Sequence, residues 1–326
     1  MSELPEIIPL DAIRAAREHI ADSVVRSPLI KLPRLESSDH LTARPPEVWL
    51  KLETLQPVGS FKLRGARNAI AGLSREELSA GVYTASAGNM ALGLAWCAKA
   101  LGIPFTAVVP DHAPAAKLSK LEQLGARLVK VPYETWWRII REHHYDGVAG
   151  RFIHPVADVA VMAGNGTIGI EILEELPEAD TVLVPFGGGG LSCGIASALA
   201  GMESAARVIG CEVETAIPLS AAFAAGAPEP VQRTPSFVDG IGGAGVLPEM
   251  WPLIQRLLQG VAVVSLEETR AAIRTLVDQV HVVAEGAGAV PVAAAMSGRV
   301  IGRVVVCVVS GGNIDSAVVA KILAEA

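Results

Sequence analysis

The chain has 326 residues, of which 51% are hydrophobic and 19% charged, with a formal net charge of −7. This composition fits a globular chain of about two domains and excludes a disordered or fibrous protein. The negative charge, without clusters of Lys and Arg, argues against a nucleic-acid partner. No apolar stretch reaches the ~18 residues of a membrane span, and the acidic N-terminus is unlike a signal peptide. We therefore expect a cytoplasmic protein with a small-molecule partner.

Short β-rich runs alternate with helical patterns, an order typical of βαβ units and a parallel sheet. We predict an α/β fold with parallel-rich twisted sheets flanked by helices. Ser60 is expected to cap the helix that follows it, and Gly102 to end the next helix. In the first half the strands are expected at 47–53, 81–86, 103–110 and 126–132, and the helices at 61–73, 90–102 and 113–125.

The alternation is interrupted at residues 133–155, and we place a crossing between two domains near the end of this segment. Ser265 and Glu268 have the spacing of a capping box ahead of a helical pattern. The second half contains an expected strand at 181–186, a helix at 191–201, a strand at 207–213, and strand–helix units at 261–280 and 303–326.

Ligands of doubly wound sheets bind outside the carboxyl ends of the strands. We expect four distinctive turns to lie at that edge because each follows a predicted strand. They are "QPVGSFK" (56–62), "TASAGN" (84–89), "PFGGGGL" (185–191) and "VVSGGN" (308–313).

The run "FGGGGLSCG" at 186–194 opens a helix after a strand. Successive glycines leave backbone N–H groups uncovered at a helix N-terminus, which favours a phosphate site over a merely tight or mobile loop. A dinucleotide-binding loop is the nearest rival, with Glu212 at the end of the next strand as its acidic residue. However, Gly188, Gly190 and Gly194 are spaced one residue too long for GxGxxG. No Walker A sequence follows.

Lys62 lies between a Pro-Val-Gly-Ser turn and a helix start. A lysine in the first turn of a helix is often simply solvated. Near a phosphate-binding loop, however, its amine is the group that the aldehyde of pyridoxal phosphate needs to form a Schiff base. A desolvated lysine also has a lowered pKa and can act as a base at neutral pH.

The turns "SAGN" (86–89) and "SGGN" (310–313) carry two interpretations each. Ser and Asn are favoured N-caps, so both turns could be ordinary helix starts. Alternatively, the first offers free N–H donors and an amide to a substrate carboxylate. The second then presents a hydroxyl to a pyridine nitrogen.

Six segments together resemble one family nearly end to end and in its order. They are "KLETLQPVGSFKLRGARNAI", "ASAGN", "HPVADVAVMAGNGTIGIEIL", "PFGGGGLSCGIA", "EGAGAVPVAA" and "SGGNID". The chain thus resembles the fold-type II pyridoxal-phosphate enzymes of the serine/threonine dehydratase and serine racemase family, whose architecture is that of tryptophan synthase β. The resemblance implies a large cofactor-binding domain of residues 1–74 and 155–326, a small domain of 75–154 that covers the active site, and a homodimer.

The resemblance also implies site residues. Lys62 is expected to be the catalytic Schiff-base lysine, and the residues around the cofactor pyridoxal 5'-phosphate follow from the matching motifs. Phe61 would pack beside the cofactor, Asn89 would bond the phenolic oxygen of its ring, and Ser310 would meet the pyridine nitrogen. The phosphate would be held by Gly187, Gly188, Gly189, Gly190 and Leu191. The substrate would be bound by Ser86, Ala87, Gly88, Asn89 and Met90. Gly240, in a turn with Asp239, and Glu285 would line the cofactor region, with a surface turn as the alternative for each.

The implied reaction is β-elimination from a β-hydroxy amino acid such as L-threonine or L-serine. Lys62 would remove the Cα proton, the cofactor phosphate would protonate the leaving hydroxyl, and hydrolysis would give a 2-oxo acid and ammonia. A neutral hydroxyl at Ser310 leaves the pyridine largely unprotonated, which favours elimination over transamination.

Three positions depart from racemases or from the family pattern. Racemases of this family have a serine at the position of Ala87, and alanine cannot move a proton, so we favour the dehydratase. Met90 replaces a frequent histidine, so the pocket is expected to be more apolar and the substrate atypical. The family's divalent-cation site matches at Glu212 and Ala216, but Pro218 replaces its second acidic residue. We therefore assign no metal.

Alternatives from other classes remain open on the sequence alone. They are a serine racemase, a dehydratase of hydroxyaspartate or of a bulkier 3-hydroxy amino acid, a nicotinamide-dependent oxidoreductase, and a noncatalytic binding protein of the same fold. The sequence does not choose the substrate, because one methyl group in a pocket changes specificity by only about 1–3 kcal/mol.

Overall fold

Two β-sheets organise the computed structural model, which describes residues 4–33 and 46–325. The larger sheet has six strands in the order β1-β2-β10-β7-β8-β9. Its neighbouring strands are parallel except for the antiparallel pair β1 and β2. The strands are Leu29–Lys31 (β1), Glu47–Leu52 (β2), Val304–Val309 (β10), Thr181–Pro185 (β7), Arg207–Val213 (β8) and Val261–Val264 (β9).

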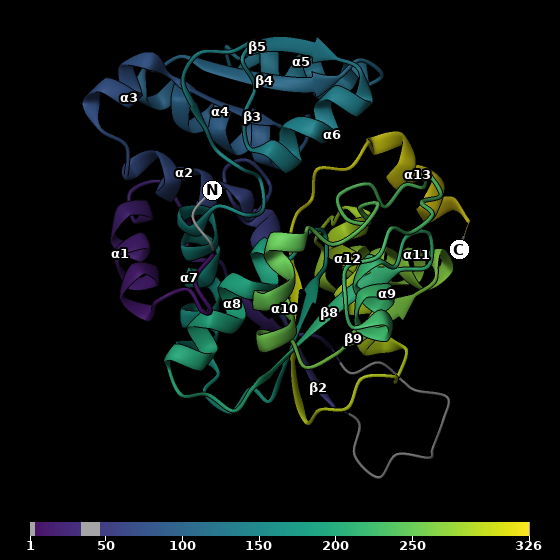
Figure 1. Cartoon of the computed structure of the whole chain (residues 1–326). Coiled ribbons are helices and arrows are strands. Elements are labelled where there is room, and N and C mark those ends of the chain that lie inside the picture. Colours follow the sequence, from purple (N-terminus) through teal and green to yellow (C-terminus); the bar gives the residue numbers. More distant parts are fainter. Residues whose placement is uncertain (1–3, 34–45, 326) are drawn as a thin grey trace.

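The smaller sheet has four strands in the order β5-β4-β3-β6, and all of its pairs are parallel. Figure 1 shows this sheet with α3 to α6 above the larger sheet and its helices. The strands are Val82–Ala85 (β3), Phe105–Pro110 (β4), Arg127–Val131 (β5) and Arg151–Phe152 (β6).

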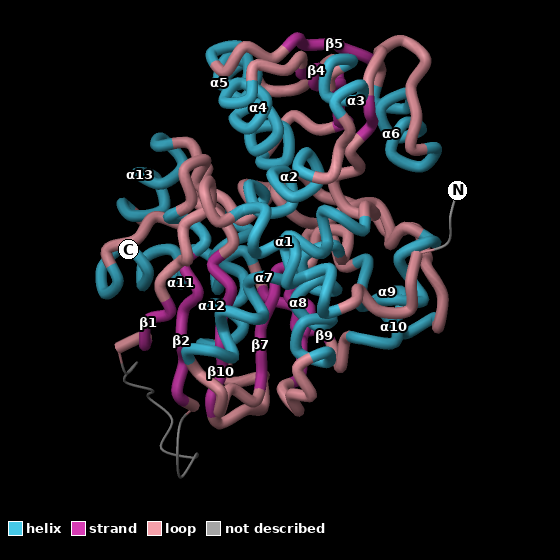
Figure 2. The backbone as a smooth tube through the Cα atoms, turned by 90° about the vertical axis from the view of Figure 1, so that its left-hand side faces the viewer, coloured by secondary structure: helices cyan, strands magenta, loops and turns pink. Residues whose placement is uncertain are grey.

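Helices connect the parallel strands and cover the sheets, as the tube view in Figure 2 also shows. In the described residues the α-helices are Leu10–Ile20 (α1), Lys62–Ala71 (α2), Arg75–Ala80 (α3), Asn89–Leu101 (α4), Ala115–Gln123 (α5), Tyr133–Glu142 (α6), Val159–Glu175 (α7), Gly190–Gly201 (α8), Pro218–Ala225 (α9), Trp251–Leu257 (α10), Leu266–Thr275 (α11), Gly286–Met296 (α12) and Ser316–Ala324 (α13). The predicted α/β fold is therefore confirmed. No helix in this part of the chain is both long enough and apolar enough to span a membrane.

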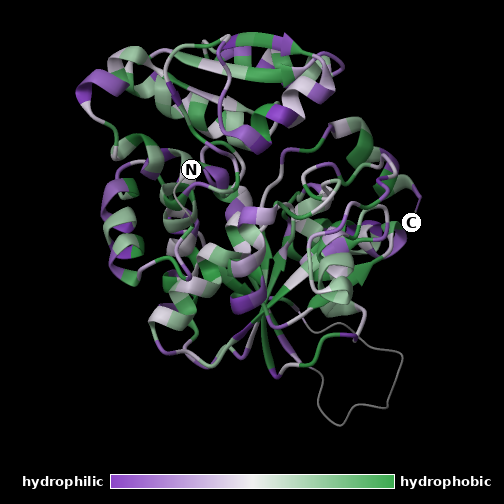
Figure 3. Cartoon of the chain, in the orientation of Figure 1, coloured by the Kyte–Doolittle hydropathy of each residue, from purple (hydrophilic) through white to green (hydrophobic). Residues whose placement is uncertain are grey.

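The strands at the centre of the larger sheet are buried on both faces. Every residue of β7 and β10 is buried, and Figure 3 shows the strands of this sheet as largely hydrophobic. Val306 packs in the same apolar cluster as residues of α7 and α8. Its neighbours Val305 and Cys307 pack in the cluster that contains α12. Continuous apolar runs such as "VVVCVV" are thus explained by alternate side chains entering two cores.

The predicted helix ends were partly confirmed by the structure. The capping box of Ser265 and Glu268 is confirmed, and Gly102 ends α4 with a φ of 67°. The N-cap of α2 is Phe61, not Ser60 as expected, although the Ser60 hydroxyl does accept from the Lys62 N–H at 3.3 Å. Ser60 also bridges to Gly311. The expected interruption at 133–155 is also wrong, since this segment forms α6 and the edge strand β6. The predicted domain bounds themselves stay a prediction.

The four distinctive turns come from two sheets, not from one edge. Three of them follow β2, β7 and β10 of the larger sheet, while the turn at 86–88 follows β3 of the smaller sheet. The expectation of a single edge is therefore wrong. The carboxyl ends of both sheets contribute to the site instead.

Candidate active site

A cavity of about 660 Å³ is lined by residues from both sheets and their helices. This volume lies within the usual range for small-molecule sites. All of the residues predicted for the site line it: Phe61, Lys62, Ser86, Ala87, Gly88, Asn89, Met90, Gly187, Gly188, Gly189, Gly190, Leu191, Gly240, Glu285 and Ser310. Their convergence is a structural finding, while the individual roles assigned to them stay predictions.

Lys62 is the first residue of α2 and its side chain is half-buried, so it is not the openly solvated lysine of the simpler interpretation. Its Nζ donates to the carbonyl oxygen of Pro155 at 2.6 Å and lies 5.2 Å from the centre of the Phe61 ring. Burial lowers the pKa of the Lys62 amine to about 8. An appreciable neutral fraction is therefore present near neutral pH, and only the neutral amine is a nucleophile or a base.

The turn before Lys62 is tied to the loop that carries Ser310. The Phe61 N–H donates to the Ser310 carbonyl at 3.0 Å, and the Gly312 N–H donates to the Gly59 carbonyl at 2.9 Å. Gly59 has a φ of +69°, a conformation that side chains rarely adopt. These backbone bonds fix Lys62 and Ser310 relative to each other across 248 residues of sequence (310 minus 62).

A buried ionic network joins α2 to neighbouring segments, and it was not predicted from the sequence. Arg64 is fully buried and donates to both carboxylate oxygens of Glu53 at 2.8 Å and to Glu171 at 2.6 and 2.9 Å. Lys51 Nζ lies 2.7 Å from Glu171. Burial alone would lower the pKa of Arg64, but Glu53 and Glu171 outweigh it and raise the pKa. Charged residues within the apolar strand pattern "EVWLKLE" were the signal available for this network.

The glycine loop has no room for side chains. A Cβ on Gly188 would lie 2.9 Å from the Val156 side chain, and one on Gly190 would lie 2.7 Å from the Val156 carbonyl oxygen. Within the described residues, the N–H groups of Gly187, Gly188 and Gly189 have no hydrogen-bond acceptor. Gly190 and Leu191 begin α8, so their N–H groups have no partner within the helix. The loop at 187–191, which we call the glycine cradle, thus presents free N–H donors at a helix N-terminus. This arrangement fits a phosphate group.

Ser310 follows β10 and is 2% exposed. Ser310 lines the cavity, and its hydroxyl forms no hydrogen bond within the described part of the chain. A serine hydroxyl can both donate and accept a hydrogen bond. A heteroaromatic nitrogen in the cavity would supply the missing partner.

Asn89 links the two sides of the cavity. Its Nδ2 donates to Glu285 at 2.8 Å, and its Oδ1 accepts from Asn313 Nδ2 at 2.8 Å. Glu285 is 8% exposed, so the surface-turn alternative is wrong for it. Burial, and then the charge of Asp239, raise the pKa of the Glu285 carboxyl to about 7.

The start of α4 lacks a side-chain cap. Its N-cap is Gly88, whose own N–H donates to Ser86 Oγ at 3.2 Å, and Asn89 is already inside the helix. The ordinary capping interpretation of "SAGN" is therefore wrong. The N–H groups of Asn89, Met90 and Ala91 find no acceptor among the described residues, so this helix end can bind a carboxylate.

His154 shapes the chain beside Lys62 and was not predicted. Its Nδ1 accepts from the N–H groups of Val156 at 3.0 Å and Ala157 at 2.7 Å, while Nε2 lies 3.0 Å from the Ile140 carbonyl. Burial, and then His143, lower the pKa of His154 to about 3, so the ring is neutral. The resulting turn places the Pro155 carbonyl on Lys62 and Val156 against the glycine loop.

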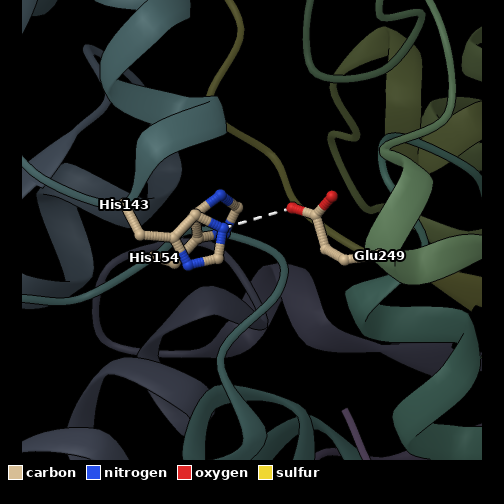
Figure 4. Close-up of side chains that lie close together, drawn as sticks. All are labelled: His143, His154 and Glu249. Carbon is tan, nitrogen blue, oxygen red and sulfur yellow. Dashed lines mark hydrogen bonds and ion pairs between the residues drawn. The ribbon is translucent and has the colours of Figure 1, made fainter. Parts of the chain in front are cut away.

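Two groups of residues that could bind a metal ion already use their polar atoms in hydrogen bonds within the protein. Figure 4 shows His143, His154 and Glu249 close together, with His143 Nε2 3.1 Å from Glu249. Because both ring nitrogens of His154 serve backbone groups, it has no lone pair left for an ion. Glu212 accepts from the Leu219 and Ser220 N–H groups at 2.6 and 2.9 Å and so holds the start of α9. Glu212 is therefore a poor ligand for either a cation or a ribose.

A half-buried lysine of lowered pKa, a cradle for phosphate and an unpaired hydroxyl at one cavity define an α/β enzyme that uses a phosphorylated, aldehyde-bearing cofactor. The chain belongs to the family described as pyridoxal-phosphate dependent enzyme, which matches residues 20–311. The predicted family and cofactor are confirmed. The nicotinamide alternative does not hold, because this family match covers the glycine loop and Glu212.

Within this family, the chain is similar to enzymes that act on threonine or serine. The chain is 42% identical over 281 residues to an L-threonine ammonia-lyase of Thermotoga maritima, a match that covers 85% of this chain and 70% of that protein. It resembles the structure of threonine deaminase isoform 2 from Solanum lycopersicum with a TM-score of 0.83, 30% identity, and coverage of 100% and 96% of the two chains. For maize serine racemase the TM-score is 0.83, the identity 31% and the coverage 97% of each chain.

Proposed function

We propose that this chain is a pyridoxal-phosphate-dependent ammonia-lyase that eliminates water from a β-hydroxy amino acid, such as L-threonine or L-serine, and gives a 2-oxo acid and ammonia. The observation that carries the proposal is the position of Lys62, whose amine of lowered pKa shares a cavity with the glycine cradle and Ser310. The similarity to proteins named L-threonine ammonia-lyase supports it.

The residues present fit the cofactor, and we assign them as follows. The N–H groups of Gly187–Gly190 and Leu191 would hold the phosphate, the Ser310 hydroxyl would be available to the pyridine nitrogen, and Phe61 and Gly240 would lie beside the ring. Asn89 and Glu285 complete the ring's polar surroundings. When bound, the cofactor supplies an electron sink for the negative charge that develops at the substrate Cα.

Lys62 moves the proton. With a pKa near 8, its amine can take the Cα proton of the substrate near neutral pH and still be reprotonated afterwards. The carbonyl of Pro155, 2.6 Å away, orients the amine. The hydrogen-bonded turn at Gly59 to Phe61 keeps the lysine from drifting, because small misplacements are costly in catalysis.

The free N–H groups at the start of α4 bind the substrate carboxylate, with Ser86, Ala87, Gly88, Asn89 and Met90 around it. Ala87 has no group that can donate a proton. The position where racemases of this family carry a serine therefore provides no second acid, and we favour elimination even though serine racemase is among the similar structures.

We further infer that residues 75–154 act as a small domain over a large cofactor-binding domain of 1–74 and 155–326, and that the enzyme is a cytoplasmic homodimer. The smaller sheet, whose strands lie between Val82 and Phe152, supports the first part. Size-exclusion chromatography with light scattering tests the oligomeric state.

The function is tested with protein loaded with pyridoxal phosphate. We expect visible absorbance that disappears on borohydride reduction, and peptide mapping should then locate the reduced cofactor on Lys62. L-Threonine and L-serine should release ammonia and a 2-oxo acid in equal amounts. A reduced digest without an adduct on Lys62 would overturn the assignment. Formation of D-serine faster than ammonia would instead favour the racemase.

A further inference from the structure

Four large apolar side chains from α4 and α6 line the cavity, and three of them have no role in the proposed reaction. We call this surface the tryptophan wall: Trp136, Trp137 and Ile140 on α6, and Met90 on α4. Met90 is 2% exposed, so its thioether fills a fixed position in the packing. None of these four side chains carries a charge.

The aromatic rings of α6 form a continuous row. The centres of the Trp136 and Trp137 rings are 6.2 Å apart, and Trp136 is stacked on Tyr133 at 5.8 Å with an interplanar angle of 28°. The Trp136 Nε1 is covered by protein and has no partner among the described residues. Trp136 therefore presents only carbon atoms to the cavity.

This concentration of aromatic residues stands out in the composition. The whole chain has only five Trp, three Tyr and six Phe, yet Tyr133, Trp136 and Trp137 fall within one turn or so of a single helix. Aromatic rings that line a cavity provide a large apolar surface and a preferred geometry for stacking another ring. Threonine, with one methyl group on its β-carbon, would leave much of this surface without a partner.

Among the described residues, one cation that lines the cavity is left for an acidic substrate side chain, and it lies outside the tryptophan wall. Lys117 pairs with Asp239 at 2.6 Å, and Lys62 is assigned to the chemistry. Arg233 lines the cavity from an exposed segment, and no described residue forms an ion pair with it, so it is the group that an acidic substrate would need. It is not part of the tryptophan wall.

We propose that the tryptophan wall selects a β-hydroxy amino acid with an aromatic β-substituent, such as 3-phenylserine, over threonine, serine and hydroxyaspartate. This inference rests on the proposed function. The Cα–H bond and the Cβ–OH bond break with net loss of water, and hydrolysis of the resulting enamine consumes one water and releases ammonia. Phenylpyruvate is then the other product, and no oxidant or reductant is needed.

The first test compares kcat/KM of the cofactor-loaded enzyme for 3-phenylserine, threonine, serine and 3-hydroxyaspartate. We expect a preference for 3-phenylserine over threonine of about tenfold or more, the scale of a methyl-sized or larger difference in an apolar pocket. In Trp137→Ala, kcat/KM for 3-phenylserine should fall about tenfold, whereas that for threonine should change less than threefold. Trp137→Phe, which keeps a ring, should retain most of the preference, and Trp96→Ala, outside the cavity, should not alter it.

A binding measurement keeps the proposal testable if the alanine variant does not fold. L-Phenylalanine and L-2-aminobutyrate lack the β-hydroxyl and cannot eliminate water, so their dissociation constants for the wild-type holoenzyme can be read from quenching of tryptophan fluorescence. We expect L-phenylalanine to bind about tenfold more tightly.

The outcomes separate the inference from the proposed function. Turnover of threonine with equal or weaker turnover of 3-phenylserine would overturn only the inference. A preference for hydroxyaspartate that is lost in Arg233→Ala would replace it with an acidic-substrate site. Ammonia from none of the four substrates would overturn the proposed function, and tighter binding of L-2-aminobutyrate than of L-phenylalanine would overturn the inference independently.

Discussion

The two sides of the cavity are built on different principles. The side from the larger sheet consists of backbone donors, a half-buried lysine and an unpaired hydroxyl, carried by the loops after β2, β7 and β10. The side from the smaller sheet is the free helix start of α4 together with the tryptophan wall. The first side is polar and nearly devoid of variable side chains, whereas most of the second is apolar surface.

This difference indicates that one side binds the cofactor and the other recognises the substrate side chain. A cofactor has one structure, so its site is set by fixed backbone groups that substitution of surface residues cannot alter. A substrate side chain is recognised by the volume and polarity of the surrounding side chains, which a single substitution can change. Substitutions on each side of the cavity can test this assignment of cofactor binding and substrate recognition.

Replacing Lys62 by alanine should reduce ammonia release about 10⁴-fold, because the side that holds the cofactor then lacks its proton-transfer group. Visible absorbance of bound cofactor and ammonia release are the two measurements. Lys99→Ala, on the exposed face of α4, is the control and should remain active. Substantial elimination by the Lys62 variant would mean that catalysis belongs to the other side of the cavity.

Glu285→Gln should change how stability depends on pH. The folded pKa of about 7 is raised above the ordinary glutamate value of 4.5, so the protonated carboxyl stabilises the fold below pH 4.5 and this contribution is lost as the pH rises through 7. Between pH 4.5 and 8 the wild type should lose about 3 kcal/mol relative to the variant. Urea unfolding of cofactor-free protein at both pH values measures the difference.

The matched control for Glu285 is Glu122→Gln on the exposed face of α5, which should show no such pH-dependent difference from the wild type. A Glu285 variant whose stability tracks that of the wild type at both pH values would contradict the prediction.

His154→Gln and His154→Asn should differ, because the structure requires an acceptor at the position of Nδ1. Asparagine places its Oδ1 near that position and can still accept from Val156 and Ala157, whereas glutamine extends beyond it. We expect His154→Gln to be less stable than His154→Asn by about 1–3 kcal/mol and to lose cofactor faster on dialysis. Equal losses in both variants would mean that the ring acts by packing alone.

Lys117→Ala should have the smallest effect. The Lys117–Asp239 ion pair joins α5 to the loop beside the glycine cradle, but its side chains are 37% and 50% exposed. Its contribution should be below about 1 kcal/mol and should vanish at high salt. Urea unfolding at low and high ionic strength tests this against Lys120→Ala on the same helix, and a larger, salt-insensitive loss would show that the pair holds the two sides together.

Local backbone requirements made part of the site predictable. Consecutive glycines before a helix indicate a phosphate site, and a lysine after a tight turn indicates a reactive amine. Both segments line the cavity, while their roles stay predictions. The capping box at Ser265 was also predictable because its partners are three residues apart. The bridge between Ser60 and Gly311 was not predictable, because the two residues are far apart in sequence.

Residues whose meaning depends on distant partners could not be interpreted from the sequence. The bond from Lys62 to Pro155 spans 93 residues and that from Asn89 to Glu285 spans 196. Arg64 and His154 look like ordinary polar residues until burial gives each a fixed set of partners.

Local sequence was enough to predict the alternation of strands and helices, the glycine loop at a helix start and the lysine after a tight turn, because these depend on the local conformations and hydrogen-bonding groups of a few neighbouring residues. Only the tertiary structure decided that the turns come from two sheets, that Glu285 is buried beside Asn89, and that two adjacent tryptophans face the cavity. The physical reason is that burial, and the pKa shifts and pocket shape that follow from it, arise where segments distant in sequence pack together.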